Sequence, residues 1–330
     1  MDELENNMQI SKEFTDTIYA HIPKKWIAGN GSSGINFHAS MSEENKSYKS
    51  SEYYYEGEMR FVHWTSVQNL LSIINTRQIR LYNLHNSSDP EEFNYAVSQL
   101  NLSDIQKDHS KNFMYTFSFS EIKEKENSYH WEKYGNNYKG VSIEFEIVNN
   151  PDEWDNFMLA PVYYEIPQKI TSLIEGLYVL KEKYQVLEFD FDLGKLIAFH
   201  KNPKFKEEKE IRLSSYFPFD STQEYWRYCN TEFRLEHTRP RITNYFGLDL
   251  WVDNDSFFIK NGSIKFDRQN ILDPYYYIKK PKILITNISF GEECGITKTL
   301  YPMFRMKLEE VIRLKLGYKV NLPLFMQKVS

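Results

Sequence analysis

The order of apolar and polar residues predicts strands and helices in mixed succession. The run RFVHWT at 60–65 has the β-branched and aromatic content of a strand. Apolar residues then recur at helical spacing over 67–77, and Ser66 is placed to cap that helix. Similar patterns predict strands at 78–84, 112–120, 141–147, 157–165, 209–217, 246–252, 256–266, 282–290 and 319–329. They predict helices at 128–134, 171–185, 193–200 and 301–317, and a further helix that begins at Pro90.

These elements do not alternate strictly as β-α-β units, which favours an α+β fold with mainly antiparallel sheets and flanking helices. Residues 1–58 are expected to form a helical arm, to about residue 27, followed by a flexible leader rich in Gly, Ser, Asn and Glu. Residues 59–330 are expected to form a single catalytic-type domain.

Composition narrows the class of protein. The chain has 330 residues, 41% hydrophobic and 26% charged, as in ordinary globular proteins. A net charge of −6 argues against a nucleic-acid coat protein, although a nucleic acid remains open as a substrate. Basic clusters near Lys24, His200 and Arg234 are interpreted as scattered solvated side chains.

The sequence does not support a disulfide framework, a structural zinc site, a signal peptide or a membrane-spanning helix. Cys229 and Cys294 lie far apart, so neither a disulfide framework nor a structural zinc site is expected. The acidic, polar start is unlike a signal peptide, and no run of about 18 apolar residues occurs. We therefore expect a cytoplasmic protein without membrane contact.

The first candidate functional residue is His63, although a single histidine in an apolar strand is more often structural than catalytic. Ser118 and Ser120 are small polar residues on a strand otherwise made of large ones. Glu208 and Glu210 are two residues apart, so both side chains should point the same way. Two such carboxylates repel unless a cation or a substrate lies between them. Arg212 shares that side, and a structural pair with Glu210 is the alternative.

The blocks FVHWTS, SDPEEF, YTFSFSE with WEKYGNNYKGVSIEF, EEKEIRL and ISFGEEC follow one another in an order that resembles the bacterial family called domain of unknown function 2971. The resemblance covers about residues 60–320. Ser88 stands where that family usually has Asn, and Tyr115 to Ser118 differs from its usual Cys-Phe-Ser. Membership in this family implies no activity by itself.

The same order more distantly resembles the ADP-ribosyltransferase superfamily, which implies a split-sheet core and NAD as substrate. By that resemblance His63, Ser118 and Glu210 would occupy three strands of the site. Glu210 would bond the ribose 2′-hydroxyl and stabilise an oxocarbenium-like state as the nicotinamide–ribose bond breaks. Glu208 would accept the proton of the attacking nucleophile, and His63 would donate to a ribose hydroxyl or a phosphate.

The resemblance implies supporting roles for neighbouring residues. Thr65 and Arg212 would line the NAD site, and Ser118 would support the strand or the glutamate. Trp131 and Tyr134 would stack on the nicotinamide ring, although their three-residue spacing is more often core packing.

Other functions stay open. The ADP-ribose acceptor would be a protein, a nucleic acid or water. The resemblance further implies that the protein is a toxin or phage-defence effector with a neutralising partner protein. A non-catalytic nucleotide- or partner-binding module is the second hypothesis. The third is a metal-dependent nuclease using Asp89 and Glu91, although capping of a helix is the simpler role for these acids. No metal-binding signature occurs in the sequence.

Overall fold

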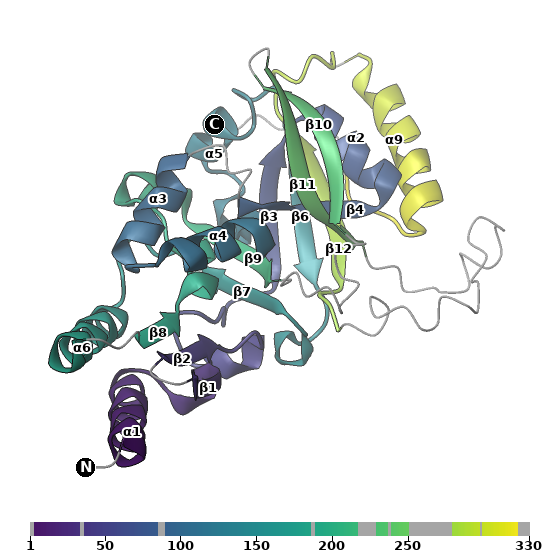
Figure 1. The fold of residues 1–330 in the computed structure, drawn as a ribbon. Helices are drawn as coiled ribbons and strands as arrows, with labels where there is room; N and C mark the ends of the chain where they lie inside the picture. The colour runs from purple at the N-terminus through teal and green to yellow at the C-terminus, as the bar shows by residue number, and fades with distance from the viewer. Residues whose placement is uncertain are drawn as a thin grey trace.

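The fold is known from a computed structural model, which describes residues 3–33, 36–84, 90–185, 189–216, 229–236, 239–250, 279–297 and 299–322. Helices flank two sheets whose paired strands are antiparallel except for one parallel pair, which confirms the expected α+β class (Figure 1). No helix in these ranges is long and apolar enough to cross a membrane.

The helices and strands have the following bounds. The α-helices are α1 (Glu3–His21), α2 (Val67–Thr76), α3 (Pro90–Gln99), α4 (Asp104–Phe113), α5 (Ser128–Lys133), α6 (Gln168–Tyr184) and α9 (Tyr301–Leu316). The strands are β1 (Ile27–Ser33), β2 (Asn36–Met41), β3 (Arg60–Thr65), β4 (Gln78–Asn83), β5 (Met114–Glu121), β6 (Val141–Ile147), β7 (Phe157–Pro161), β8 (Phe189–Asp192), β9 (Glu210–Tyr216), β10 (Cys229–Glu236), β11 (Arg239–Asp249) and β12 (Ile283–Phe290). Two 3₁₀ helices, η6 (Gly194–Phe199) and η7 (Pro203–Glu208), precede β9.

Strand β5 is the centre of the larger sheet. Among the described residues that sheet has nine strands, and its main path runs β10-β11-β4-β5-β3-β6-β12. One edge of β5 pairs along its length with β9, which also pairs with β7. The other edge pairs with β4 at Tyr115 and Thr116, and with β3 at Ser120 and Glu121. The sheet therefore divides beside residues 117–119, where β3 and β4 separate.

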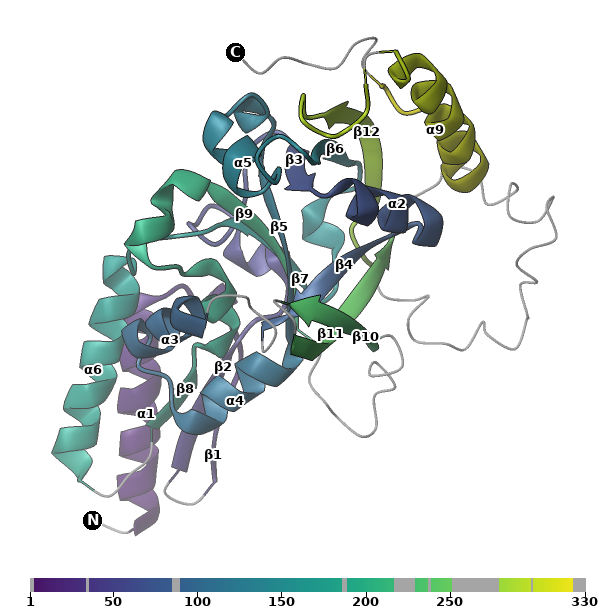
Figure 2. The same ribbon diagram turned by 90° about the horizontal axis from the view of Figure 1, so that it is seen from above.

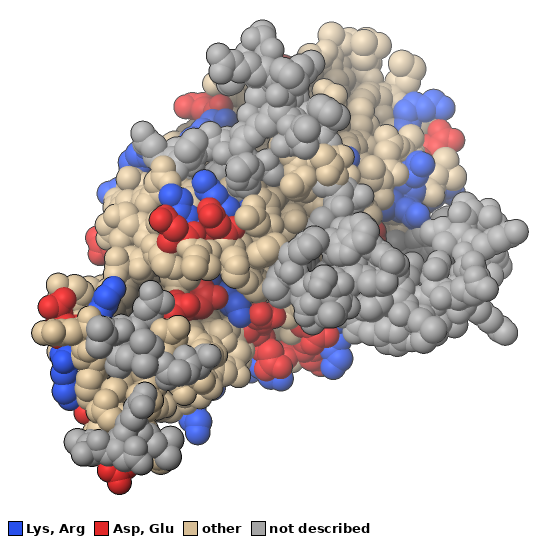
Figure 3. Space-filling view, in the orientation of Figure 1, with Lys and Arg blue, Asp and Glu red and all other residues tan. Residues whose placement is uncertain are grey.

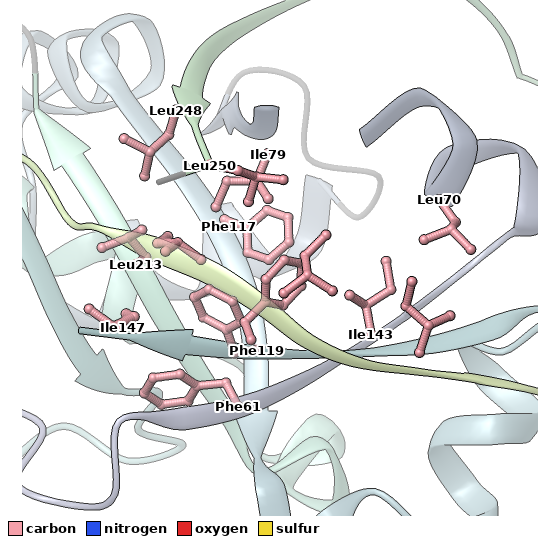
Figure 4. Packing of buried hydrophobic residues seen from close by; sticks show 14 of the residues in the cluster. Phe61, Leu70, Ile79, Phe117, Phe119, Ile143, Ile147, Leu213, Leu248 and Leu250 are labelled. Atoms are coloured by element: carbon pink, nitrogen blue, oxygen red, sulfur yellow. The ribbon is translucent and has the colours of Figure 1, made fainter. Parts of the chain in front are cut away.

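Side chains alternate along β5 and β9, so one face of the pair is apolar and the other is polar. Phe117, Phe119 and Leu213 point into the main hydrophobic core, together with residues of β3, β6 and α2 (Figure 4). Ser118 and Glu210 point to the opposite face. The sheet thus supports a polar cluster on a rigid apolar base.

The expectation of a flexible leader after the N-terminal arm is wrong. Residues 27–33 and 36–41 form the antiparallel pair β1 and β2, and β2 pairs with β8. Trp26, Tyr48 and Tyr53 are fully buried in a second hydrophobic core. Helices α1 and α6 lie side by side over this part of the fold (Figure 2). The Gly, Ser and Asn residues of β1 and β2 are equally typical of loops, which concealed the alternating burial of β2.

Helix boundaries followed the sequence where capping residues mark them. The hydroxyl of Ser66 accepts a hydrogen bond from the backbone N–H of Asn69, as an N-cap does. Pro90 begins α3, and Gly317 ends α9 with a φ of 77°. The expected hairpin turn at 261–262 and the cap at Asp89 lie outside the described residues, as does most of the expected terminal strand.

Charged side chains of both signs are interspersed on the face seen in Figure 3. Among the described residues several surface charges form ion pairs, such as Lys49 with Asp152 at 2.7 Å and Lys183 with Glu13 at 2.6 Å. Other charged side chains, among them Glu208 and Glu210, are buried beside β9.

Candidate functional site

Two carboxylates meet where η7 ends and β9 begins. Glu208 is the last residue of η7 and Glu210 is the first of β9, while Lys209 between them takes a left-handed φ of 43°. Both glutamates are buried, with exposed fractions of 4% and 6%. Burying two negative charges this close together requires compensating cations.

Lys201 supplies the central cation. Its ammonium lies 2.6 Å from Oε2 of Glu208 and 3.0 Å from Oε2 of Glu210, and its side chain is buried. The sequence raised the question of what would separate the two carboxylates, and the structure answers it with this lysine. Lys201 was missed because it belongs to a basic cluster that we interpreted as solvated. The spacing of Glu208 and Glu210 in the sequence could have indicated that a cation lies between them.

Arg212 and Ser118 complete the contacts of Glu210. The guanidinium donates from Nε to Oε1 at 2.6 Å and from one terminal nitrogen to Oε2 at 3.1 Å, a two-point pairing. Its other terminal nitrogen donates to the carbonyl of Ala198 in η6 at 2.8 Å. The hydroxyl of Ser118, which faces Arg212 across the β5–β9 ladder, donates to Oε1 of Glu210. The structural Glu–Arg pair foreseen as an alternative is therefore present.

These contacts keep both carboxylates ionised. Burial alone would raise the pKa of Glu210, but the charges of Arg212 and Lys201, with hydrogen bonds from Arg212 and Ser118, hold that pKa well below its ordinary value. Burial likewise opposes ionisation of Glu208, and Lys201, Lys133 and Tyr134 together lower its pKa. A carboxylate with a lowered pKa is a strong electrostatic partner and a weak base.

His63 fills the division of the sheet. Its imidazole Nδ1 lies 2.9 Å from the carbonyl oxygen of Ser118, and its ring packs 4.6 Å from that of Phe117. Burial lowers the pKa of His63 to about 4, so the ring is neutral at pH 7 and Nδ1–H donates to the carbonyl. The other nitrogen, Nε2, can then only accept a hydrogen bond. The role we expected, donation to a ribose hydroxyl or a phosphate, requires a proton that this tautomer lacks.

His63 and Thr65 do not share a face with the carboxylates. Val62 pairs with Ser120, and Ser120 pairs with Glu210, so these three side chains point to one face and His63 points to the other. Thr65 follows His63 in the same alternation, is buried, and accepts a hydrogen bond from Asn69 at 2.9 Å. His63 reaches the glutamate only through the main chain of Ser118.

Trp131 and Tyr134 differ in their surroundings. Trp131 is 1% exposed and lies parallel to Tyr138 in a small core with Val62 and Trp64. Tyr134 is 38% exposed, and its hydroxyl hydrogen-bonds Glu208. The structure thus brings Tyr134, but not Trp131, to the carboxylates.

Lys133 is a further residue that the sequence did not single out. It ends α5, and its ammonium donates to Oε1 of Glu208 at 2.5 Å and to the hydroxyl of Tyr129 at 3.0 Å. His130, three residues before Lys133 in α5, is buried and donates from Nε2 to the carbonyl of Glu208 at 2.9 Å. Helix α5 therefore fixes both the side chain and the main chain of Glu208.

The polar cluster is defined here as Ser118, Lys133, Tyr134, Lys201, Glu208, Glu210 and Arg212. Ser118, Lys133 and Tyr134 are exposed, whereas the other four are buried. Within the described ranges no three His, Cys, Asp or Glu residues gather as metal ligands. The arrangement offers a substrate ionised carboxylates under a partly exposed hydroxyl, a phenol and an ammonium.

Comparison with known proteins finds one similarity, which covers part of the polar cluster. No curated protein and no solved structure matches the chain. The model of the family described as "Protein of unknown function (DUF2971)" matches residues 130–213, from within α5 to within β9. That segment contains both glutamates, Lys133, Lys201 and Arg212 but neither His63 nor Ser118. Over this segment the chain is similar to domain of unknown function 2971.

Proposed function

We propose that the chain is an ADP-ribosyltransferase-like enzyme that cleaves the nicotinamide–ribose bond of NAD and passes ADP-ribose to a macromolecule or to water. The observation that carries the proposal is Glu210, an ionised carboxylate held by Ser118 of the adjacent strand. The resemblance implied one functional residue on each of three strands. His63, Ser118 and Glu210 lie on β3, β5 and β9, which pair consecutively.

The chemistry needs a negative charge that is already present and fixed. Loss of nicotinamide leaves positive charge on the ribose, and a nearby carboxylate stabilises that state or bonds the 2′-hydroxyl. The lowered pKa of Glu210 keeps it ionised at pH 7. Ser118 is exposed beside it, and Tyr134 presents a partly exposed ring for the nicotinamide.

Two of the roles implied by the resemblance change with this geometry. His63 becomes a positioning residue that holds the carbonyl of Ser118 from the opposite face of the sheet. Glu208 is paired with Lys133 and Lys201, so it accepts a proton readily only after one of these cations withdraws.

Release of nicotinamide from NAD tests the proposal. We expect release by the wild type, with and without cell lysate as a source of acceptor, and its loss in Glu210→Gln. Glu43→Gln is the matched control, because Glu43 pairs with buried Lys195 at 2.8 Å beside Tyr216, at the opposite end of β9 from Glu210. Absence of release from the wild type, or equal release by Glu210→Gln, would contradict the proposal.

The second candidate is a non-catalytic binding module that uses the same residues. The observation in its favour is that Arg212, Lys201 and Ser118 already bond both oxygens of Glu210. Such a carboxylate could serve to anchor β9. Binding of NAD by calorimetry without any release of nicotinamide would favour this module. The nuclease hypothesis rests on Asp89 and on the side chain of Glu91, both of which lie outside what the structure describes. Sensitivity of an activity to EDTA would support this hypothesis.

A further inference from the structure

Lys133 places its ammonium among three aromatic rings. The nitrogen lies 5.3 Å from the ring centre of Tyr129, 5.2 Å from that of Tyr134 and 5.1 Å from that of Phe205. Tyr129 is in α5, Tyr134 follows it, and Phe205 is in η7. Rings at such distances attract a cation through their quadrupoles. We call these three rings and Glu208 the cation cage.

Hydrogen-bond acceptors complete the cation cage. Glu208 accepts from the ammonium at 2.5 Å, and the hydroxyl of Tyr129 accepts at 3.0 Å. The hydroxyl of Tyr134 also interacts with Glu208 and helps to lower the pKa of that carboxyl. A carboxylate, an acceptor hydroxyl and aromatic faces together recognise an ammonium group by charge, by N–H direction and by dispersion.

The two lysines on Glu208 differ in their freedom to leave. The side chain of Lys201 is 9% exposed and bridges both carboxylates, whereas that of Lys133 is 38% exposed. If Lys133 withdraws, Glu208 keeps Lys201 but loses its partner at Oε1. A buried carboxylate in that state favours another cationic donor over an anion or an apolar group.

We propose that the cation cage is a binding site for a primary alkylammonium ion, the chemical class of a lysine side chain, and that Lys133 is its internal occupant, which the ligand displaces. The cation cage shares Tyr134 and Glu208 with the proposed NAD site, but binding of an ammonium ion there does not require NAD. It would hold a lysine of a partner polypeptide or a free alkylamine.

The acceptors select a primary ammonium over a quaternary one. Glu208 and the hydroxyl of Tyr129 each take an N–H, which a trimethylated nitrogen cannot supply. Lys201 and Lys204 also lie over Phe205, at 4.9 Å and 4.8 Å, so cationic charge is already dense on one side. A compact, singly charged ligand is therefore favoured over a polyvalent one.

Titration of n-butylammonium chloride, followed by NMR, tests the proposal in the Lys133→Met variant. Methionine removes the charge and keeps an unbranched side chain. Since the internal occupant no longer competes, we expect binding about tenfold tighter than in the wild type. Lys209→Met is the matched control, because Lys209 pairs with Glu124 at 3.1 Å and not with Glu208. The Lys209→Met variant should bind the probe no better than the wild type does. Equal affinity of Lys133→Met and wild type would overturn the proposal.

Two further arms separate the cation cage from non-specific binding. Phe205→Leu added to Lys133→Met should weaken binding severalfold by removing one aromatic wall. Uncharged 1-pentanol, of similar length, should not bind; affinity equal to that of n-butylammonium would show a merely apolar site and refute the proposal.

The wild type provides a test that no folding defect can obscure. The side-chain ammonium resonance of Lys133 should show slow proton exchange and should move toward that of solvated lysines as n-butylammonium is added. A resonance that stays unchanged while the probe shifts Tyr134 would show that Lys133 is not displaced. Because NAD is absent throughout, failure here leaves the proposed function to its own test.

Discussion

The two faces of the β5–β9 pair show how one pair of strands provides both stability and a candidate site. On one face Phe117, Phe119 and Leu213 pack in the main core. On the other, Ser118 and Glu210 join two buried cations. The apolar face gains free energy by removing surface from water, whereas the charged face must recover a desolvation cost through pairing. A buried charge network contributes little net stability compared with apolar packing, and this contrast is why we propose a functional role for the polar face.

The largest effect is expected on the apolar face. Phe119 is 2% exposed and lies within 6 Å of the rings of Phe61, Phe117 and Phe145. Phe119→Ala should lower the free energy of unfolding by about 3–5 kcal/mol, since it loses transfer energy and leaves a cavity. Urea denaturation measures this change, and Phe119→Leu should cost distinctly less. A loss below about 1 kcal/mol would show that the two faces do not differ as described.

Breaking the pairing on the polar face comes next. Arg212→Met leaves Glu210 buried with one cation fewer, and we expect a loss of about 3 kcal/mol. The double variant Arg212→Met with Glu210→Gln should recover part of that loss, because no uncompensated charge remains. Denaturation of the two variants and of Glu210→Gln forms a double-mutant cycle. Additive effects would mean that Arg212 does not act on Glu210.

The pH dependence of stability distinguishes the faces further. The folded-state pKa of Glu210 lies below the ordinary value of 4.5, so its contribution is fully present above that pH and is lost as pH falls below it. Glu210→Gln should be less stable than the wild type by about 1–3 kcal/mol at neutral pH. The two stability curves should converge on acidification. A difference that is constant with pH would show that the charge of Glu210 is not stabilised by its partners.

An exposed ion pair gives the smallest effect and a baseline for the buried ones. Arg305 and Glu309 face each other one turn apart on α9 at 2.9 Å, with side chains 27% and 45% exposed. Glu309→Gln should cost at most about 0.5 kcal/mol, because solvent screens the pair. Thermal unfolding in low and high salt measures it. A cost near that of Arg212→Met would remove the distinction between exposed and buried pairs.

Sequence patterns identified most of the fold because apolar period and capping residues act locally. The strand at 60–65 and the helix from 67 were evident, and the cap at Ser66 was confirmed. The β1–β2 pair was missed because its Gly, Ser and Asn residues are equally typical of loops. The structure of β2 depends instead on its packing against residues far along the chain.

The candidate site was only partly evident for a related reason. The spacing of Glu208, Glu210 and Arg212 shows in the sequence because one short segment carries all three. Lys133 lies far from them in the chain, and Lys201 looks like any surface lysine until the fold buries it. The hydrogen bond of His63 to a main-chain carbonyl depends on where the sheet divides, which no local pattern encodes.

The measurement that most directly tests the account is a titration of NAD into isotopically labelled protein, followed through the backbone amide resonances. If the polar face of β5 and β9 is an NAD site, the amides of Ser118, Tyr134 and Glu210 should shift most and saturate together. The amides of Glu43, near the opposite end of β9, and of Glu309, on α9, should stay in place. Saturation with NAD that leaves Ser118, Tyr134 and Glu210 unshifted would contradict the assignment of function to this face.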